Sequence, residues 1–178
     1  MGYGPDLLTG DNRYFITSRG DWSELGATNT VTWDGTFEDI KCVAADGTAS
    51  VRRTAAKITL PGTIATTTTY EFEYWVEHNG TYAGTELSAA VSGMTGVVED
   101  RITDVNPTTD KQKAVFRFTT VTDTTGVLNI RALGTIPDQN DECFVDNCRL
   151  RTWTADAGAG MGVAQQRAPR IGFAKGSF

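Results

Sequence analysis

The clearest alternation of apolar and polar positions lies between Thr69 and His78. The apolar residues occupy every second position: Tyr70, Phe72, Tyr74 and Val76. The acidic residues stand between them: Glu71, Glu73 and Glu77. A period of two is typical of a β-strand with one buried face. The stretch therefore predicts a central strand, and its glutamates are interpreted as a solvated face that also discourages edge pairing.

Shorter stretches of the same kind follow one another along the chain. Strands are predicted at 30–33, 36–40, 50–53, 56–60, 86–91, 113–120, 126–133 and 142–153, with weaker extended patterns at 97–98 and 101–105. Asp34-Gly35 between two extended runs suits a two-residue type I′ hairpin turn. No useful length of the chain shows helical periodicity. The pattern predicts an all-β fold, a jelly-roll β-sandwich of about nine to ten antiparallel strands.

Length and charge narrow the class of protein. A chain of 178 residues suits a single domain with its own core. The formal net charge of −6 argues against a nucleic-acid partner, because phosphate contacts need clustered lysine and arginine. The first residues resemble no secretory signal, and no apolar run is long enough to span a bilayer. We therefore expect no membrane association and synthesis in the cytoplasm.

Composition divides the chain into a lead-in segment at 1–28, the sandwich at 29–153 and a C-terminal arm at 154–178. The arm is rich in glycine and lacks acidic residues from Ala157 onward, which predicts a flexible, weakly basic segment. Ordering such a segment costs entropy that a neighbouring chain can offset. Its basic and apolar side chains are therefore predicted to bind partners: Arg167, Arg170, Ile171, Phe173, Lys175 and Phe178.

The three cysteines, Cys42, Cys143 and Cys148, form no CxxC pair. An odd number without that motif favours free thiols in a reducing compartment over a disulfide framework. A single disulfide between two of them stays an open alternative. Cys148 has the strand parity of Phe144 and Leu150, which predicts a packed core cysteine.

The order of landmarks resembles the carbohydrate-binding modules that have a galactose-binding-like jelly roll. The matching stretches are Thr9-Gly10-Asp11 with Trp22, Gly47 to Val51, Pro61-Gly62, Tyr70 to Val76, Val115 to Thr120, and Val145 to Leu150. The resemblance covers residues 7 to 153 and implies the fold more than an activity. A short jelly roll with a flexible arm also resembles, in layout, the decoration, cement and fibre proteins of tailed bacteriophages.

A sugar site needs aromatic faces beside planar hydrogen-bonding groups. The candidate ligand-binding residues are Trp33, Trp75, Tyr82 and Trp153. For each of them, packing in the core or against another subunit is the competing interpretation.

The resemblance also implies a structural Ca²⁺ held by Asp11 and Asp146, with a hydrogen-bonded turn as the alternative role. No other cofactor is expected. His78 is the only histidine, and no nucleophile or metal-binding motif is present, so we expect no catalytic residues and no enzymatic activity.

The main functional hypothesis is a structural virion protein of a tailed bacteriophage. It would decorate the capsid exterior, with the arm bound to the major capsid protein or other virion proteins. Several symmetric copies would convert weak contacts into stable attachment, and a homotrimer is expected. The alternatives are a carbohydrate-binding module and a tail or head-fibre component that recognises host glycans.

Overall fold

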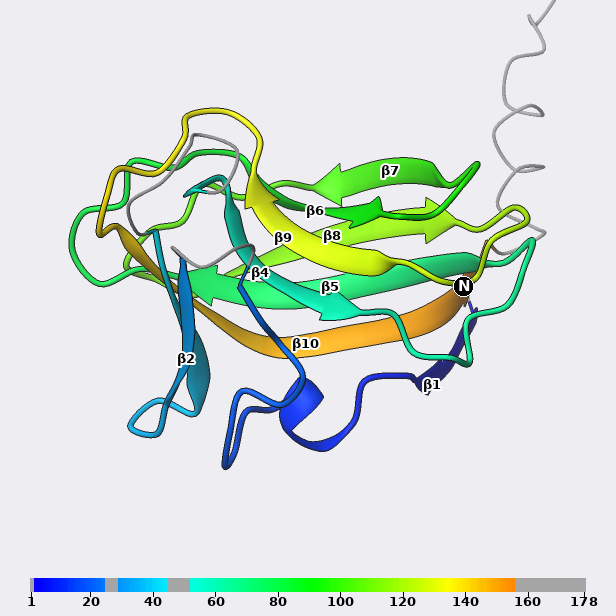
Figure 1. Ribbon diagram of the computed structural model, residues 1–178, viewed down its shortest axis with the longest axis horizontal. Helices are drawn as coiled ribbons and strands as arrows, with labels where there is room; N and C mark the ends of the chain where they lie inside the picture. The colour runs from blue at the N-terminus through cyan, green and yellow to red at the C-terminus, as the bar shows by residue number, and fades with distance from the viewer. Residues whose placement is uncertain (1, 25–28, 45–51, 156–178) are drawn as a thin grey trace, which may run out of the picture.

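The computed structural model describes residues 2–24, 29–44 and 52–155, and it is an antiparallel β-sandwich (Figure 1). Its elements are β1 Gly2–Asp6, the 3-10 helix η1 Gly10–Asn12, β2 Thr30–Asp34, β3 Asp39–Val43, β4 Thr54–Thr59, β5 Thr69–Glu77, β6 Leu87–Ser92, β7 Val98–Thr103, β8 Gln112–Thr119, β9 Val127–Ala132 and β10 Glu142–Thr154. The all-β, jelly-roll prediction is confirmed. None of the helical structure in these residues is both long and apolar enough to cross a bilayer.

Two sheets form the layers of the sandwich. The larger has seven strands in the order β2-β3-β10-β5-β8-β7, with β1 paired to β10 as well. The smaller has three strands in the order β4-β9-β6 and lies in front of the larger one in Figure 1. Strand β10 is long enough to pair with β3 near its start, with β1 near its end, and with β5 along most of its length.

The core lies between the sheets and contains alternate residues of the central strands. Tyr70, Phe72 and Tyr74 of β5 are each at most 1% exposed, as the alternation predicts. Their rings continue into neighbouring aromatic contacts, such as Tyr70 on Phe118 with 5.4 Å between centroids. The N-terminal segment adds Trp22, whose ring lies 6.2 Å from that of Phe72. The lead-in segment therefore packs against the sandwich, both through β1 and through this tryptophan.

The hairpin prediction is correct in kind and wrong in its turn. Strands β2 and β3 do pair, but Asp34 faces Asp39, so four residues connect the strands instead of two. The Asp34 carboxylate accepts a hydrogen bond from the Thr36 backbone N–H at 2.9 Å, and Glu38 has a φ of 57°. An Asx turn of this kind starts a wider loop than the type I′ geometry.

Two other predictions need correction. A strand at 50–53 is wrong for the part described, since Arg52 and Arg53 lie outside any strand. Phe144 does not share a face with Cys148, because the register between β10 and β5 shifts between Asp146 and Arg149. Asn147, with a φ of 48°, sits in this bulge, and an extra residue reverses the parity on either side of it. Cys148 is buried in the core as predicted.

Candidate functional site

The face of the larger sheet that points away from the three-stranded sheet carries charged and aromatic side chains. Strand β5 places Glu71, Glu73 and Trp75 on this face, because their neighbours Tyr70, Phe72 and Tyr74 point into the core. The strand register sets side chains of β8 and β10 beside them. We call this surface the outer face, and its members are Glu71, Glu73, Trp75, Lys113, Arg117, Arg151 and Trp153.

A continuous chain of ion pairs crosses the outer face. Lys113 Nζ lies 2.8 Å from Glu73 Oε1, and Arg151 Nη2 lies 2.8 Å from Glu73 Oε2. Arg151 also reaches Glu71 Oε1 at 3.4 Å, while Arg117 donates to Glu71 Oε2 from Nε at 2.9 Å and from Nη2 at 2.7 Å. These contacts join β8, β5 and β10 through three cations and two carboxylates.

Glu71 corrects the interpretation of the glutamates as a solvated face. Its side chain is only 2% exposed, although strand parity points it away from the core. The two arginines and the rings stacked on them account for this burial. The Arg117 guanidinium lies 4.0 Å from the centroid of Trp153, and that of Arg151 lies 3.7 Å from the centroid of Tyr3 in β1. Cation–π contacts of this kind fix the orientation of both guanidinium groups.

Trp153 marks one end of the outer face and Trp75 lies toward the other. Trp153, Thr69 and Arg117 line a hollow of about 230 Å³, together with Val98 of β7. Thr69 and Trp75 are six residues apart on β5, which is a rise of about 20 Å. Trp75 is half-buried and lies between Asp146 of β10 and Lys113 of β8 in the strand register. The sequence-predicted aromatics Trp75 and Trp153 therefore share one face.

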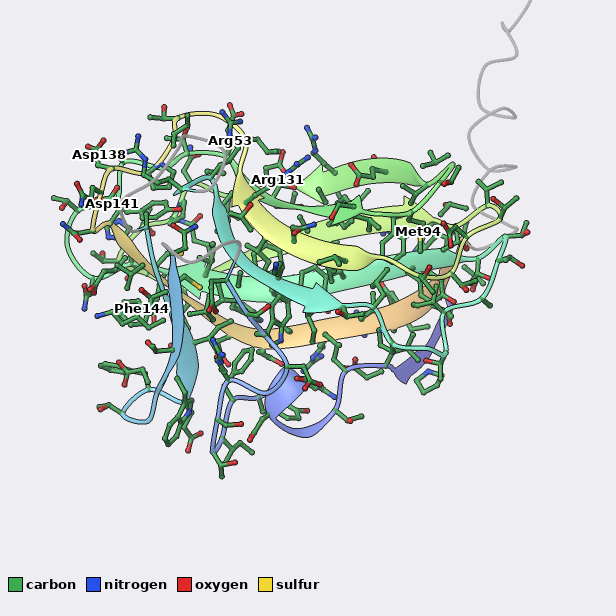
Figure 2. The ribbon with its side chains drawn as sticks, in the orientation of Figure 1. Arg53, Met94, Arg131, Asp138, Asp141 and Phe144 are labelled. Carbon is green, nitrogen blue, oxygen red and sulfur yellow. The ribbon has the colours of Figure 1, made fainter. Side chains whose placement is uncertain are left out.

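Two further hollows lie beyond Trp75, and both include Phe37 from the β2–β3 loop. One, of about 170 Å³, is lined by Phe37, Glu77, His78, Asn79, Thr109 and Phe144. The other, of about 250 Å³, is lined by Tyr14, Ile16, Phe37, Glu38, Asp146 and Asn147. Phe37 is 62% exposed, which is unusual for a phenylalanine. Figure 2 labels Phe144 at the end of β10 that carries this hairpin.

Sequence reasoning missed Phe37, Phe144 and Tyr14. Tyr14 and Phe37 lie in loops, where no alternation marks them, and Phe144 was assigned by strand parity to the face of Cys148. The available signal for Phe37 was its position within three residues of the Asp34-Gly35 turn signal, where an apolar side chain in the loop has no strand partner to cover it.

Lys111 connects this region to a group of carboxylates. Its Nζ lies 3.0 Å from Asp146 Oδ2, 3.2 Å from Asp39 Oδ1 and 3.8 Å from Glu77 Oε1. The Asp39 side chain is 1% exposed. Burial raises the pKa of Asp39 to about 6, against the opposing effect of the Lys111 charge. Asp39 is therefore a carboxyl group that changes its charge near pH 6.

Trp33 and Tyr82 lie apart from the outer face. Trp33 of β2 is 41% exposed, and its indole Nε1 donates to the backbone oxygen of Phe15 at 2.6 Å. Tyr82 packs against the core, where burial raises the pKa of its hydroxyl, and its ring stacks on His78 with centroids 6.2 Å apart. The four predicted ligand-binding aromatics thus divide into two on the outer face and two elsewhere.

The predicted calcium ligands have separate partners. Asp11 accepts hydrogen bonds from Thr17 Oγ1 at 2.6 Å and from Ser18 Oγ at 2.7 Å, so it organises its own loop. Asp146 accepts from Lys111. Among the described residues, no three or more acidic, histidine or cysteine side chains are grouped to hold a metal ion. The turn interpretation fits Asp11 better than the metal interpretation. The predicted partner-binding residues of the arm lie outside the described residues.

The architecture defines the class of fold. The two antiparallel sheets form the jelly roll of carbohydrate-binding modules, as solved structures show. A xylan-binding CBM22-1 domain of Paenibacillus barcinonensis Xyn10C matches with a TM-score of 0.63 at 15% identity, over 88% of this chain and 99% of that one.

Two other solved structures extend the comparison. The CBM22-1–GH10 modules of Clostridium thermocellum xylanase 10B, solved with xylohexaose, match with a TM-score of 0.56 at 16% identity, over 89% of this chain and 30% of that one. The second N-terminal cellulose-binding domain of Cellulomonas fimi β-1,4-glucanase C matches with a TM-score of 0.51 at 12% identity, over 85% of this chain and 98% of that one. No protein-family model and no curated protein matches the sequence.

Proposed function

We propose that this chain is a non-enzymatic glycan-binding module whose outer face binds a polysaccharide chain. The observation that carries the proposal is the arrangement of Trp75 and Trp153 on one face, with hydrogen-bonding side chains between them. The structures that share this fold include domains described as binding xylan and cellulose. Extended β-linked polysaccharides of that kind are the ligand class we propose.

The chemistry of the outer face suits such a ligand. Sugar rings have apolar faces that stack on indole and hydroxyls that need hydrogen-bond partners. Glu73, Lys113 and Arg151 present carboxylate, ammonium and guanidinium groups between the two tryptophans. Their mutual ion pairs orient these groups before a ligand arrives, and pre-organised groups lose less entropy on binding. A span of about 20 Å accommodates several sugar rings in a row.

The proposal is tested by isothermal titration calorimetry of the full chain with xylohexaose and cellohexaose, and by affinity electrophoresis in soluble xylan. We expect binding to at least one of them. Trp75→Ala and Trp153→Ala should each weaken it at least about tenfold, the loss of a central contact residue. Trp33→Ala is the matched control, since Trp33 lies off the outer face, and it should leave affinity unchanged. Failure of every β-linked ligand to bind, or an equal loss in Trp33→Ala, would contradict the proposal.

A structural role in a virion is not the main function that we propose. It depended on residues 157–178 and on a likeness of layout, and neither the described residues nor the matched structures support it. It stays a separate prediction about location. If the arm attaches the chain to a virion, a chain ending at Asp156 should fold and bind glycan normally but fail to attach. Full attachment of the shortened chain would remove the hypothesis.

A further inference from the structure

Two of the three cysteines lie directly opposite one another on neighbouring strands. Cys42 of β3 and Cys143 of β10 are Cα partners in the antiparallel register. Directly opposed residues of antiparallel strands have Cα atoms about 4.5 or 5.5 Å apart. Both spacings fall within the range of about 4.4 to 6.8 Å that disulfides span. The two thiols contact each other, are almost fully buried and are free.

The third cysteine has no such partner. Cys148 lies five residues beyond Cys143 on the same strand, so it is opposite neither Cys143 nor Cys42 in the strand register. The bulge at Asn147 lies between them. Of the three pairings that the sequence allows, strand register permits only Cys42 with Cys143.

We propose that Cys42 and Cys143 form a reversible cross-strand disulfide by exchange with a low-molecular-weight disulfide such as oxidised glutathione. The first thiolate attacks the glutathione disulfide, forming a mixed disulfide and releasing one reduced glutathione. The second thiolate attacks the protein sulfur of that mixed disulfide, forming the Sγ–Sγ bond and releasing the second reduced glutathione. The two protons lost by the cysteines are taken up by the two released glutathione thiolates.

The surroundings of the pair predict slow exchange in the folded protein. A hydrogen bond with the neighbouring Cys143 thiol, together with burial, raises the pKa of Cys42, so little of the Cys42 thiolate is present near neutral pH. The adjoining cavity is only about 10 Å³, and its lining includes both cysteines, Tyr82 and Asp141. Glutathione cannot enter such a space. The bond must therefore form when β3 separates from β10 or before the sheet closes.

The bond would fasten the β2–β3 hairpin to the centre of the larger sheet. Among the described strands, β2 alone lies outside β3 in the strand order, whereas β10 lies between β3 and β5. The hairpin carries Phe37, which lines two of the hollows beyond Trp75. Oxidation would thus hold one side of those hollows in place. The proposal does not depend on glycan binding, because it follows from strand register alone.

The test uses the full chain in two arms, one kept native and one unfolded in urea and refolded, each in buffers with graded ratios of oxidised to reduced glutathione. Remaining thiols are alkylated and the protein is mapped by mass spectrometry. Trypsin alone leaves Cys143 and Cys148 on one peptide, 132–149, so chymotrypsin is added to cut after Phe144. We expect the refolded arm to show a 42–143 bond with Cys148 free, and the native arm to reach the same product more slowly.

Variants and stability complete the test. The oxidised protein should melt on the order of 10 °C higher than the reduced protein, because the bond closes a loop of about 100 residues. Cys148→Ala should keep this shift, whereas Cys42→Ala and Cys143→Ala should abolish it. The proposal is overturned if the refolded arm gives three free thiols, glutathione adducts only, or a bond that includes Cys148. A 42–143 bond that lowers the melting temperature would also overturn it.

Discussion

Asp39 carries a carboxylate that folding removes from water. In the unfolded chain the Asp39 carboxyl group loses its proton near pH 4, whereas in the native protein it keeps the proton up to about pH 6. Between these values the native state binds more protons than the unfolded state, so the contribution of Asp39 to stability falls as pH rises. Above about pH 6 the contribution of Asp39 to stability no longer changes with pH. The ammonium group of Lys111 limits the fall, because it favours the ionised form.

We therefore expect Asp39→Asn to change the pH dependence of stability. The free energy of unfolding of the wild type minus that of the variant should be largest at about pH 4 and smaller by about 1–2 kcal/mol at pH 7. Urea unfolding of both proteins at five values from pH 4 to pH 8 measures this difference. Taking the difference between the two proteins removes the pH dependence that does not involve Asp39. A difference that is constant, or that grows with pH, would show that Asp39 is not buried as described.

Single residues also mark the limit of what the sequence could predict. Strand parity placed Glu71, Glu73 and Glu77 correctly on the face opposite Tyr70, Phe72 and Tyr74. It could not show that Glu71 is buried, because that depends on arginines about 46 and 80 residues away in sequence. Parity failed for Phe144 because of the bulge at Asn147. Next to this bulge β10 contacts the N-terminal segment, where the Cys148 N–H donates to the Arg13 backbone oxygen at 3.0 Å.

At the scale of elements, the Glu71 ion pairs connect three strands of the larger sheet. Glu71→Gln would remove the charge that two partly buried guanidinium groups face, at 2.7 Å for Arg117 and 3.4 Å for Arg151. Breaking one side of a buried ion pair is strongly destabilising, because the opposite charges stay desolvated. We expect a loss of about 2–3 kcal/mol in the free energy of unfolding, measured by urea denaturation at pH 7.

Glu77→Gln is the matched control for that change. Glu77 is on the same strand, but it lies 3.8 Å from Lys111, which is 38% exposed and has two other carboxylate partners. A pair of this kind contributes less than about 1 kcal/mol. Equal losses in the two variants would mean that the position on β5, rather than the buried network, determines the cost.

Elements with long alternation were predictable, and those made by local turns or edge pairing were not. Strands β5, β8 and β9 follow their apolar patterns closely. Strand β1 escaped prediction because Gly2–Asp6 has two glycines and a proline and no alternation. Proline is tolerated in a strand that lies at a sheet edge, and within the described part of the chain β1 pairs with β10 alone. Residues 2–6 therefore form a strand because they pair with β10, and their own sequence does not indicate this pairing.

For the whole molecule, the proposed function predicts a link between ligand and stability. A glycan that binds only the folded state adds free energy according to its concentration and affinity, about 2.7 kcal/mol at one hundred times the Kd. For a domain of this size each kcal/mol raises the melting temperature by about 2–4 °C. We therefore expect xylohexaose, or whichever hexasaccharide binds, to raise the melting temperature by about 5–10 °C at that concentration.

The same experiment separates specific binding from a general effect of sugar on stability. Sugars excluded from the protein surface stabilise any fold, and they would do so equally in the wild type and in a Trp75→Ala variant. Binding at the outer face would instead raise the melting temperature of the wild type and of Trp33→Ala, while Trp75→Ala and Trp153→Ala would show little change. Because melting reports on the intact sandwich, the comparison also shows whether the variants are folded. An equal rise of the melting temperature in all four proteins would mean that the sugar does not act at the outer face. The outer face would then no longer be a candidate for glycan binding.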